Sequence, residues 1–292
     1  SQKKGMIMTV NGQTKTCGLI GNPVEHTLSP VIHNMLAKMT GKNLIYVPFL
    51  VEGENLADAV KGAAALGIRG LNVTVPYKER IIPFLKDVDA LAQKIGAVNT
   101  LVQEAGGFKG YNTDMPGLYR AMLSDGVSVD GEDVIILGAG GVARAVAVML
   151  SEKAGRIFVL NRTGEKAMAI AEEVNGYAGR QVAKAMPLSA WKELPDGKYL
   201  AVQATSVGMH PCIDDVLIAD TDFYQRIHTG YDLIYNPFET LFMKLVKKEG
   251  GQAFNGLKML LYQGIIAYEL WNGLSVSGEQ ADRIYERLRE SL

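Results

Sequence analysis

The strongest constraint on the fold is the stretch from residue 133 to residue 163, DVIILGAGGVARAVAVMLSEKAGRIFVLNRT. An apolar run at 134–137 is short enough for a buried strand, and a glycine-rich turn at 138–141 follows it directly. A segment rich in Ala and Val then suits a helix, and a second apolar run ends at residue 160. Strand, turn, helix and strand in this order predict the opening of a dinucleotide-binding fold.

The turn has the residue types that a pyrophosphate site needs. Gly138, Gly140 and Ala143 fill the G-x-G-x-x-G/A positions: the first permits a tight turn, the second lets the backbone approach the phosphates, and the third lets helix pack on strand. The pattern is weak alone because Gly and Ala are common, but both flanking strands favour nucleotide binding over a plain βαβ turn. The turn residues expected to bind the cofactor are Gly138, Ala139, Gly140, Gly141 and Val142.

The end of the second strand indicates which nucleotide is bound. An NAD site normally offers an Asp or Glu there for the ribose 2′-hydroxyl. This chain has Asn161, Arg162 and Thr163 instead, with Lys166 shortly after. A guanidinium donates charge-assisted hydrogen bonds to a phosphate, so these four residues favour NADP, although N-R-T also suits an ordinary helix start.

Composition excludes several classes of protein. The 292 residues are 48% hydrophobic and 21% charged with a net charge of −1, which is typical of a globular protein of two domains and gives no basic surface for nucleic acid or an anionic membrane. Cys17 and Cys212 form no C-x-x-C pair, and the four histidines show no H-x-x-x-H spacing, so we expect no disulfide framework and no metal site. The N-terminal sequence does not have the pattern of a signal peptide, and we expect a cytoplasmic protein.

The first half of the chain alternates between predicted strands and helices. A strand at 16–20 leads into a turn, and Ser29 is predicted to cap a helix that has Pro30 at its first position and ends before Gly41. Residues 126–131 are rich in turn formers and mark a linker. The other predicted strands are 44–49, 68–74, 199–204, 231–234 and 252–254. The other predicted helices are 54–66, 87–95, one that follows residue 114 and runs to about 124, 165–174, 240–249, 257–271 and 279–292.

Three polar residues of this half stand near strand ends. Lys78 follows N-V-T-V-P-Y, Asn99 lies in G-A-V-N-T-L, and Asp114 ends G-Y-N-T-D. Ligands of open α/β sheets bind at the carboxyl ends of the strands. Each residue also has an ordinary interpretation, as a solvated lysine, a turn former and a helix cap, but together with a nucleotide site they favour a functional cluster.

These motifs resemble those of the shikimate dehydrogenases, which reduce 3-dehydroshikimate to shikimate with NADPH on the route to chorismate. The resemblance runs from about residue 18 to residue 263. It rests on G-N-P-x-x-H-x-x-S-P at 21–30, N-V-T-V-P-Y-K at 72–78, A-V-N-T-L at 97–101, N-T-D at 112–114, G-A-G-G at 138–141, N-R-T at 161–163 and Y-N-P at 235–237.

The resemblance implies a role for each matching residue. Lys78 and Asp114 correspond to the catalytic pair, and Leu233 and Gly256 to positions that line the nicotinamide. The residues that correspond to substrate contacts are Thr27, Ser29, Thr74, Asn99, Tyr235 and Gln263. The implied fold is α/β with an N-terminal substrate domain (1–114 plus 256–292), to which the C-terminal helices return, and a Rossmann-type NADP-binding domain (115–255). The expected partner is a small-molecule substrate, with no nucleic acid or membrane, in a monomer or homodimer.

The chain departs from the family pattern at three places. Thr27 replaces the usual serine, Met115-Pro116 replaces a glycine after N-T-D, and Leu241 replaces a proline. Because Thr27 adds a methyl group beside the expected carboxylate site, a quinate/shikimate dehydrogenase with relaxed cofactor use stays an alternative. A nucleotide-binding sensor without catalysis is a third possibility, which the presence of both Lys78 and Asp114 disfavours.

Overall fold

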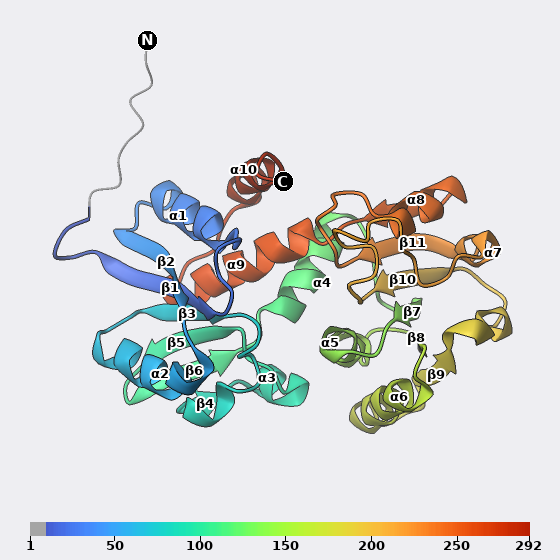
Figure 1. Ribbon diagram of the computed structural model, residues 1–292, viewed down its shortest axis with the longest axis horizontal. Coiled ribbons are helices and arrows are strands. Elements are labelled where there is room, and N and C mark those ends of the chain that lie inside the picture. The colour runs from blue at the N-terminus through green and yellow to red at the C-terminus, as the bar shows by residue number, and fades with distance from the viewer. Residues whose placement is uncertain (1–9) are drawn as a thin grey trace, which may run out of the picture. The chain divides into compact units, whose positions relative to one another are not determined.

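The computed structural model describes residues 10–292, which form two compact units, each built on one six-stranded sheet (Figure 1). Unit 1 comprises the chain up to Gly117 together with Leu261–Ser291, and unit 2 comprises Leu118–Leu260. Both divisions fall inside helices, α4 (Asp114–Ser124) and α9 (Leu257–Asn272). The expectation about a signal peptide concerns residues that lie outside the described range.

The sheet of unit 1 has the strand order β2-β1-β3-β5-β6-β4. Its strands are β1 (Lys15–Gly21), β2 (Leu44–Leu50), β3 (Gly70–Val73), β4 (Asp87–Val88), β5 (Thr100–Glu104) and β6 (Gly107–Tyr111). β1 pairs in parallel with β2 and β3, whereas β5 runs antiparallel to β3 and β6. Because β5 is reversed, the residue that precedes it, Asn99, lies at the same edge as the residues that follow β3 and β6.

The helices of unit 1 are α1 (Ser29–Met39), α2 (Leu56–Ala65) and α3 (Ala90–Ile95), together with the N-terminal part of α4, most of α9, and α10 (Gly278–Arg289). Two predictions were wrong here. The predicted helix 87–95 begins only at Ala90, because Asp89 caps it through Leu91 N and the preceding pair forms β4. Ser29 is not the N-cap of α1: the helix already includes Ser29, Leu28 precedes it, and no side chain caps it.

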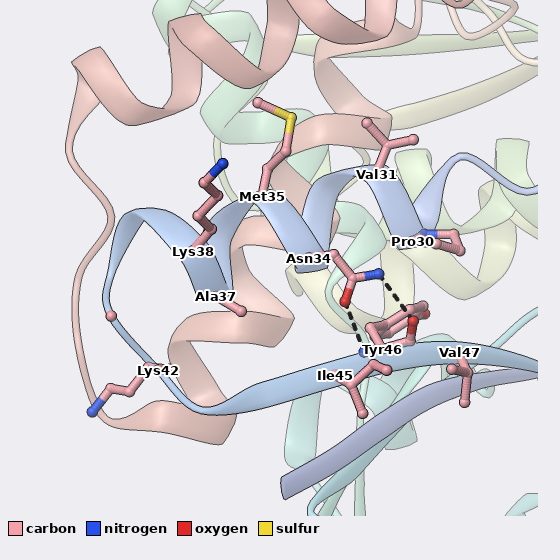
Figure 2. A pocket seen from close by; sticks show the side chains of 11 residues that line it. Pro30, Val31, Asn34, Met35, Ala37, Lys38, Lys42, Ile45, Tyr46 and Val47 are labelled. Atoms are coloured by element: carbon pink, nitrogen blue, oxygen red, sulfur yellow. Dashed lines mark hydrogen bonds between the residues drawn. The ribbon is translucent and has the colours of Figure 1, made fainter. Parts of the chain in front are cut away.

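Strand β2 forms an edge of this sheet, and Asn34 of α1 closes part of its outer side (Figure 2). Alternate residues from Asn43 to Val51 pair with β1, so Leu44, Tyr46, Pro48 and Leu50 direct their backbone groups outward. Asn34 of α1 satisfies both groups of Tyr46: its Oδ1 accepts from Tyr46 N at 2.9 Å and its Nδ2 donates to Tyr46 O at 3.0 Å. An apolar groove of about 740 Å³ runs between α1 and β2 at this place.

The sheet of unit 2 is entirely parallel, with the strand order β12-β11-β10-β7-β8-β9. Its strands are β7 (Asp133–Leu137), β8 (Arg156–Asn161), β9 (Ala183–Pro187), β10 (Tyr199–Gln203), β11 (Ile227–Asp232) and β12 (Gln252–Phe254). Helices α5 (Gly141–Leu150), α6 (Gly164–Ala178), α7 (Thr221–Tyr224) and α8 (Leu241–Lys248) connect them. The order reverses between β7 and β10, which makes the carboxyl ends of these two strands the topological switch point.

The strand-turn-helix-strand prediction is confirmed as β7, the turn, α5 and β8, and all of β7 after Asp133 is buried. The predicted strand 231–234 was misplaced: β11 covers Ile227–Asp232, so Leu233 and Ile234 lie beyond its carboxyl end. β9 was missed because Lys184 and Pro187 are exposed and interrupt the apolar pattern.

The C-terminal segment packs on unit 1. Trp271 of α9 donates from Nε1 to Leu101 O at 2.9 Å, and Gly70 has no side chain because a Cβ there would lie 2.0 Å from Trp271 Nε1. Helix α10 (Gly278–Arg289) begins with a capping box formed by Ser277 and Gln280. Among residues 10–292 no helix combines the length and apolarity needed to cross a membrane.

Candidate functional site

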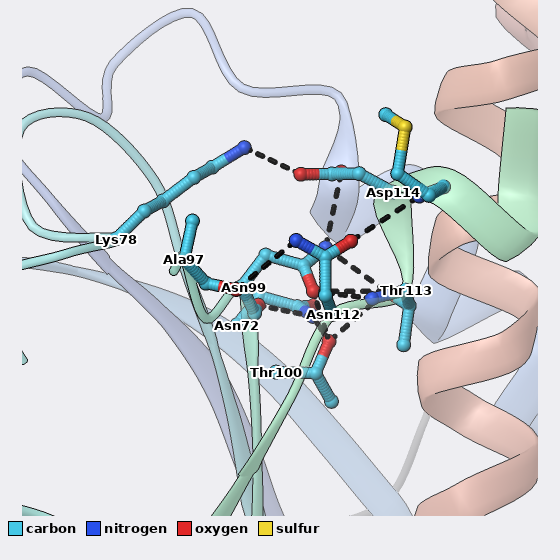
Figure 3. Close-up of polar contacts among 9 residues, drawn as sticks. Asn72, Lys78, Ala97, Asn99, Thr100, Asn112, Thr113 and Asp114 are labelled. Carbon is cyan, nitrogen blue, oxygen red and sulfur yellow. Dashed lines mark hydrogen bonds and ion pairs between the residues drawn. The ribbon is translucent and has the colours of Figure 1, made fainter. Parts of the chain in front are cut away.

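Lys78 and Asp114 form an ion pair at the accessible side of the polar cluster of unit 1 (Figure 3). Lys78 Nζ lies 2.7 Å from Asp114 Oδ2, although the two residues are far apart in the sequence. The side chains are 33% and 17% exposed, so the pair is accessible from solvent yet partly shielded. Lys78 lies in the loop after β3, and Asp114 is the first residue of α4.

Asn99 fixes the carboxylate of Asp114 from the other side. Its Nδ2 donates to Asp114 Oδ1 at 3.0 Å and to Thr113 Oγ1 at 2.9 Å, while its Oδ1 accepts from Thr113 N at 2.7 Å. Both oxygens of Asp114 therefore have a donor. The interpretation of Asp114 as only a helix cap is wrong, because Asn112 Oδ1 accepts from Met115 N, the role that a cap would have.

Three further residues of the cluster were not predicted from the sequence. Asn112 also donates to Ala97 O at 3.1 Å, and Thr113 shares its hydroxyl with Thr100 at 3.1 Å. Asn72 donates to Thr100 Oγ1 at 3.1 Å and accepts from Tyr46 OH at 2.8 Å. The sequence signal was present, because Asn72, Asn112 and Thr113 stand in the same motifs as Lys78 and Asp114. All three side chains are buried, and their hydrogen bonds fix the backbone and side chains around the accessible Lys78–Asp114 pair.

Beneath this cluster lies an aromatic stack. The ring of His33 lies 4.2 Å from that of Tyr46, and both side chains are buried. Burial lowers the pKa of His33 to about 3, so the imidazole is neutral at ordinary pH. His33 is therefore a core histidine and offers no charge to a ligand.

The other predicted substrate contacts of unit 1 lie in the loops and helices around its sheet. Thr27 Oγ1 accepts from Ser29 N at 3.2 Å, so the two hydroxyl residues share one turn at the start of α1. Thr74 packs against Gly21, where a Cβ would lie 2.3 Å from its methyl carbon. Gln263 is a buried residue of α9. A Cβ on Gly117 would lie 2.6 Å from the backbone nitrogen of Gln263, so α9 packs closely against the first turn of α4.

In unit 2 the glycine-rich turn has the geometry that a pyrophosphate site requires. Gly138 has φ of +112°, and a Cβ there would lie 2.5 Å from the methyl carbon of Thr205. A Cβ on Gly140 or Gly141 would meet nothing within 4 Å, so the backbone is open on that face. No side chain caps α5 at Gly140, whereas Ala143 is fully buried. The free amide groups of the helix start are thus accessible to an anion, with Ala139 and exposed Val142 beside them.

The cations at the end of β8 are also accessible. Arg162, Thr163 and Lys166 are exposed, and within residues 10–292 neither cation forms an ion pair or hydrogen bond. Asn161 Nδ2 donates to Thr163 O at 2.9 Å and shapes the turn before α6. Arg144 differs, since its guanidinium is held by both oxygens of Glu173 at 2.7 and 2.5 Å. The residues present therefore fit NADP: an open turn for the pyrophosphate and two unpaired cations for a 2′-phosphate.

The remaining predicted residues follow β11, in the case of Leu233 and Tyr235, and β12, in the case of Gly256. Leu233 N donates to Gln203 O at 3.1 Å, and Gly256 N donates to Ile234 O at 3.0 Å. A Cβ on Gly256 would lie 2.1 Å from Leu233 O, so this position excludes any side chain unless the backbone moves. Tyr235, predicted to contact the substrate, belongs to unit 2 and is partly buried, which raises the pKa of its hydroxyl.

No cluster of three or more His, Cys, Asp or Glu side chains suited to a metal ion occurs in the part of the chain that the structure describes. None of the predicted site residues lines the groove between α1 and β2. The chemistry-bearing groups thus concentrate at the strand ends of the two units.

Comparison with known proteins gives consistent matches along the chain. The family model for the shikimate dehydrogenase substrate binding domain matches residues 19–101, and the model for shikimate / quinate 5-dehydrogenase matches residues 121–202. A shikimate dehydrogenase (NADP(+)) from Carboxydothermus hydrogenoformans is 41% identical over 268 residues, which are 92% of this chain and 95% of that protein.

Solved structures agree with the sequence matches. A shikimate dehydrogenase crystallised in complex with NADP+ is 40% identical and superposes with a TM-score of 0.87, covering 96% of this chain and 97% of the other. A quinate dehydrogenase from Corynebacterium glutamicum in complex with NAD is 28% identical with a TM-score of 0.84, over 95% and 99% of the two chains. The resemblance found in the motifs is confirmed, and the chain belongs to the shikimate dehydrogenase family.

Proposed function

We propose that this protein catalyses the reversible NADPH-dependent reduction of 3-dehydroshikimate to shikimate, on the route to chorismate. The observation that carries the proposal is the pair of Lys78 and Asp114 at 2.7 Å, accessible to solvent at the strand ends of unit 1. Family membership supplies the substrate class, and the open glycine turn with two unpaired cations in unit 2 supports NADP as the cofactor.

Lys78 acts as the acid and base in this mechanism. When bound, NADPH supplies the hydride that reduces the carbonyl carbon of the substrate. Lys78 Nζ donates a proton to the carbonyl oxygen as that oxygen becomes an alkoxide, and takes the proton back in the reverse direction. Asp114 holds the ammonium group in place, and Asn99 holds Asp114. Since Lys78 is 33% exposed, it can exchange its proton with solvent after each turnover.

The substrate would be held mainly by hydroxyl and amide groups. Thr27 and Ser29, which share one turn, would donate to its carboxylate. Its hydroxyls would meet the other predicted contacts, which are Thr74, Asn99, Tyr235 and Gln263. Hydrogen bonds to a charged group contribute about 1.5–3 kcal/mol each, so the two hydroxyls at the start of α1 would dominate the affinity for the acid.

Cofactor binding is assigned to unit 2 in the same way. The predicted residues are Gly138, Ala139, Gly140, Gly141, Val142, Asn161, Arg162, Thr163, Lys166, Leu233 and Gly256. We assign the substrate to residues 1–114 and 256–292, and NADP to residues 115–255. We also propose a cytoplasmic monomer or homodimer, which is consistent with Cys17 and Cys212 both being free thiols.

A quinate/shikimate dehydrogenase with relaxed cofactor use is the second candidate. Thr27 in place of a serine and the similarity to a quinate dehydrogenase that binds NAD favour it. The unpaired Arg162 and Lys166 favour NADP over NAD. A sensor without catalysis is disfavoured, because it has no need for the lysine-carboxylate pair.

An absorbance assay at the NADPH band tests these alternatives. The protein is assayed with shikimate and with quinate, each in the presence of NADP+ or NAD+. We expect the highest kcat/KM for shikimate with NADP+. Comparable rates on quinate or with NAD+ would favour the second candidate, and no reduction of either cofactor with either acid would refute the proposed function.

A further inference from the structure

A second polar network lies at the carboxyl ends of β10 and β11, outside the predicted site. Its centre is Asp232, the last residue of β11, which is fully buried. Oδ2 of Asp232 accepts from Thr240 Oγ1 at 2.6 Å, and Oδ1 accepts from Ile234 N at 3.0 Å and from Gln203 Nε2 at 3.3 Å. A buried carboxylate without a cation is costly unless hydrogen bonds compensate it, and these three donors compensate this one.

Gln203, the last residue of β10, extends the network into the following loop. Its Oε1 accepts from both the backbone nitrogen and the hydroxyl of Thr205, at 2.7 and 2.6 Å. Its Nε2 donates to Val207 O at 3.1 Å in addition to Asp232. The side chain of Gln203 therefore fixes the loop 204–208 to the end of the neighbouring strand.

The network touches the cofactor turn on one side. The methyl carbon of Thr205 packs directly against Gly138. A Cβ on Gly138 would lie only 2.5 Å from this carbon, so the contact requires glycine. This contact lies at the switch point between β7 and β10, where ligands of such sheets bind.

On the other side the network fixes the segment after β11. Leu233 N is bonded to Gln203 O, and Ile234 N to Asp232. Thr240 both donates to Asp232 and caps α8 by accepting from Met243 N at 3.3 Å. Asp232 therefore holds the segment from Leu233 to Thr240 near both of its ends, through Ile234 N and through Thr240 Oγ1. Tyr235 lies within this segment.

We propose that Gln203 and Asp232 are positioning residues that hold Thr205, Leu233 and Tyr235 in place around the reactive end of the cofactor. The inference rests on the proposed function, because it assumes that these loops face the nicotinamide and the substrate. Gln203 and Asp232 themselves are buried and touch neither ligand. They act through the two loops, so their loss changes the geometry of hydride transfer more than the affinity for NADP.

The first test replaces Gln203 with leucine, which keeps the volume and removes every hydrogen bond of the amide. A misplacement of about 1 Å costs about 10²-fold in rate, and we expect kcat of Gln203→Leu to fall about 10- to 100-fold. The Kd for NADP+ should change less than about threefold, since Arg162 and Lys166 are untouched. The deuterium isotope effect with 4-deuterated NADPH should rise, because hydride transfer becomes more rate-limiting.

A matched control separates positioning from stability. Tyr224→Phe removes another buried hydrogen bond of unit 2, from Tyr224 OH to Ile218 O at 2.7 Å, in the core around α7. It should lower the melting temperature as Gln203→Leu does, with kcat and the isotope effect unchanged. If Gln203→Leu behaves like Tyr224→Phe in all these measurements, the network is only structural and the proposal is refuted.

A milder pair of variants covers the case in which Gln203→Leu does not fold. Thr240→Val removes the hydroxyl that donates to Asp232, and Thr240→Ser keeps it. We expect Thr240→Val to lose about 3- to 10-fold in kcat, the cost of one misplaced contact, and Thr240→Ser to stay within about twofold of the wild type. Equal kcat values for the two variants would refute the proposal.

Amide hydrogen exchange keeps the inference separate from the proposed function. If the wild type oxidises neither shikimate nor quinate, the function is refuted while positioning can still be tested. Saturating NADP+ should then protect residues 204–208 from exchange in the wild type and in Tyr224→Phe, but not in Thr240→Val. Equal protection in all three proteins would refute the positioning role.

Discussion

Two aspartates stand at strand ends of this protein and have opposite surroundings. Asp114 in unit 1 faces the ammonium group of Lys78 and is 17% exposed, whereas Asp232 in unit 2 is fully buried among neutral donors. Burial raises the pKa of Asp232 to about 6. Asp114 thus has a cation beside it, while the carboxylate of Asp232 must be desolvated to be ionised in the fold.

The difference shows how one residue type serves two purposes. A carboxylate beside an accessible lysine can orient a proton donor, because the lysine still reaches solvent and substrate. A carboxylate buried among a hydroxyl, an amide and a backbone N–H can only fix their positions. Substitutions in the first network should therefore change turnover with little effect on stability, whereas those in the second should change both.

The largest effect is expected in the first network. Lys78→Met removes the proton donor, and general acid-base catalysis contributes about 10²–10⁴-fold, so kcat should fall by that factor while NADPH binding is kept. The measurement is NADPH absorbance together with a fluorescence titration of the cofactor. Lys86→Met, which removes a lysine paired with Glu104 at 3.2 Å on the same unit, is the control and should keep normal turnover. Near-normal turnover of Lys78→Met would show that Lys78 is not the proton donor, and that Asp114 does not orient one.

The second network should determine a pH dependence of stability. The pKa of Asp232 rises from 3.8 in the unfolded chain to about 6 in the fold. Its contribution to stability is therefore complete below pH 3.8 and lost as the pH rises through about 6. The loss amounts to about 3 kcal/mol at 1.4 kcal/mol for each pH unit.

Asp232→Asn should abolish this dependence. Urea unfolding of both proteins at several pH values gives the difference in unfolding free energy, in which the opposite contribution of His33 cancels. We expect the variant to gain about 2 kcal/mol in unfolding free energy relative to the wild type between pH 4 and pH 7, because part of the total loss already occurs below pH 4. A difference that does not change with pH would show that Asp232 is not the isolated buried charge described above.

An intermediate effect is expected at the end of β8. Arg162→Ala should weaken NADPH about 10- to 100-fold and leave NADH nearly unchanged, since a charge-assisted hydrogen bond contributes about 1.5–3 kcal/mol. Arg156→Ala, at the opposite end of the same strand and paired with Asp133, is the matched control. Dissociation constants for both cofactors decide the matter, and equal losses for NADPH and NADH would exclude a 2′-phosphate role.

The smallest effect should follow from making the same Asp→Asn change at Asp114. Because the pair with Lys78 is partly exposed, the substitution should change the unfolding free energy by less than about 1 kcal/mol. If Asp114→Asn loses as much unfolding free energy as Gln203→Leu, the two carboxylates do not differ in their contribution to stability. Urea unfolding at pH 7 is sufficient to measure it.

The sequence predicted the parts of the molecule whose signals are local. Residues 134–160 combine strand and helix periodicity with a glycine turn, and β7, α5 and β8 follow that pattern. β9 could not be predicted, because its burial comes from packing beside β8 and not from an apolar sequence. The Ser29 cap failed because the preceding turn already brings Leu28 into a helical conformation.

The candidate site could be predicted by motif but not by contact. Lys78, Asn99 and Asp114 were expected together, and the structure confirms that they meet. The supporting groups Asn112 and Thr113 were missed because an amide or hydroxyl in a motif does not reveal its partner. Asp232 was overlooked for another reason: it is the last residue of β11, but the predicted strand continued to residue 234 and so placed it in the strand interior.

The closed edge of β2 has a consequence for association between chains. An added strand must receive N–H donors from the edge that it joins. Here Leu44 N is bonded to Lys42 O, Tyr46 N to Asn34, and Pro48 has no N–H, which leaves Leu50 as the outward donor. With Leu50 as the one remaining outward N–H donor between residues 44 and 50, this edge is a poor template for an added strand, although the apolar groove beside it is open to water.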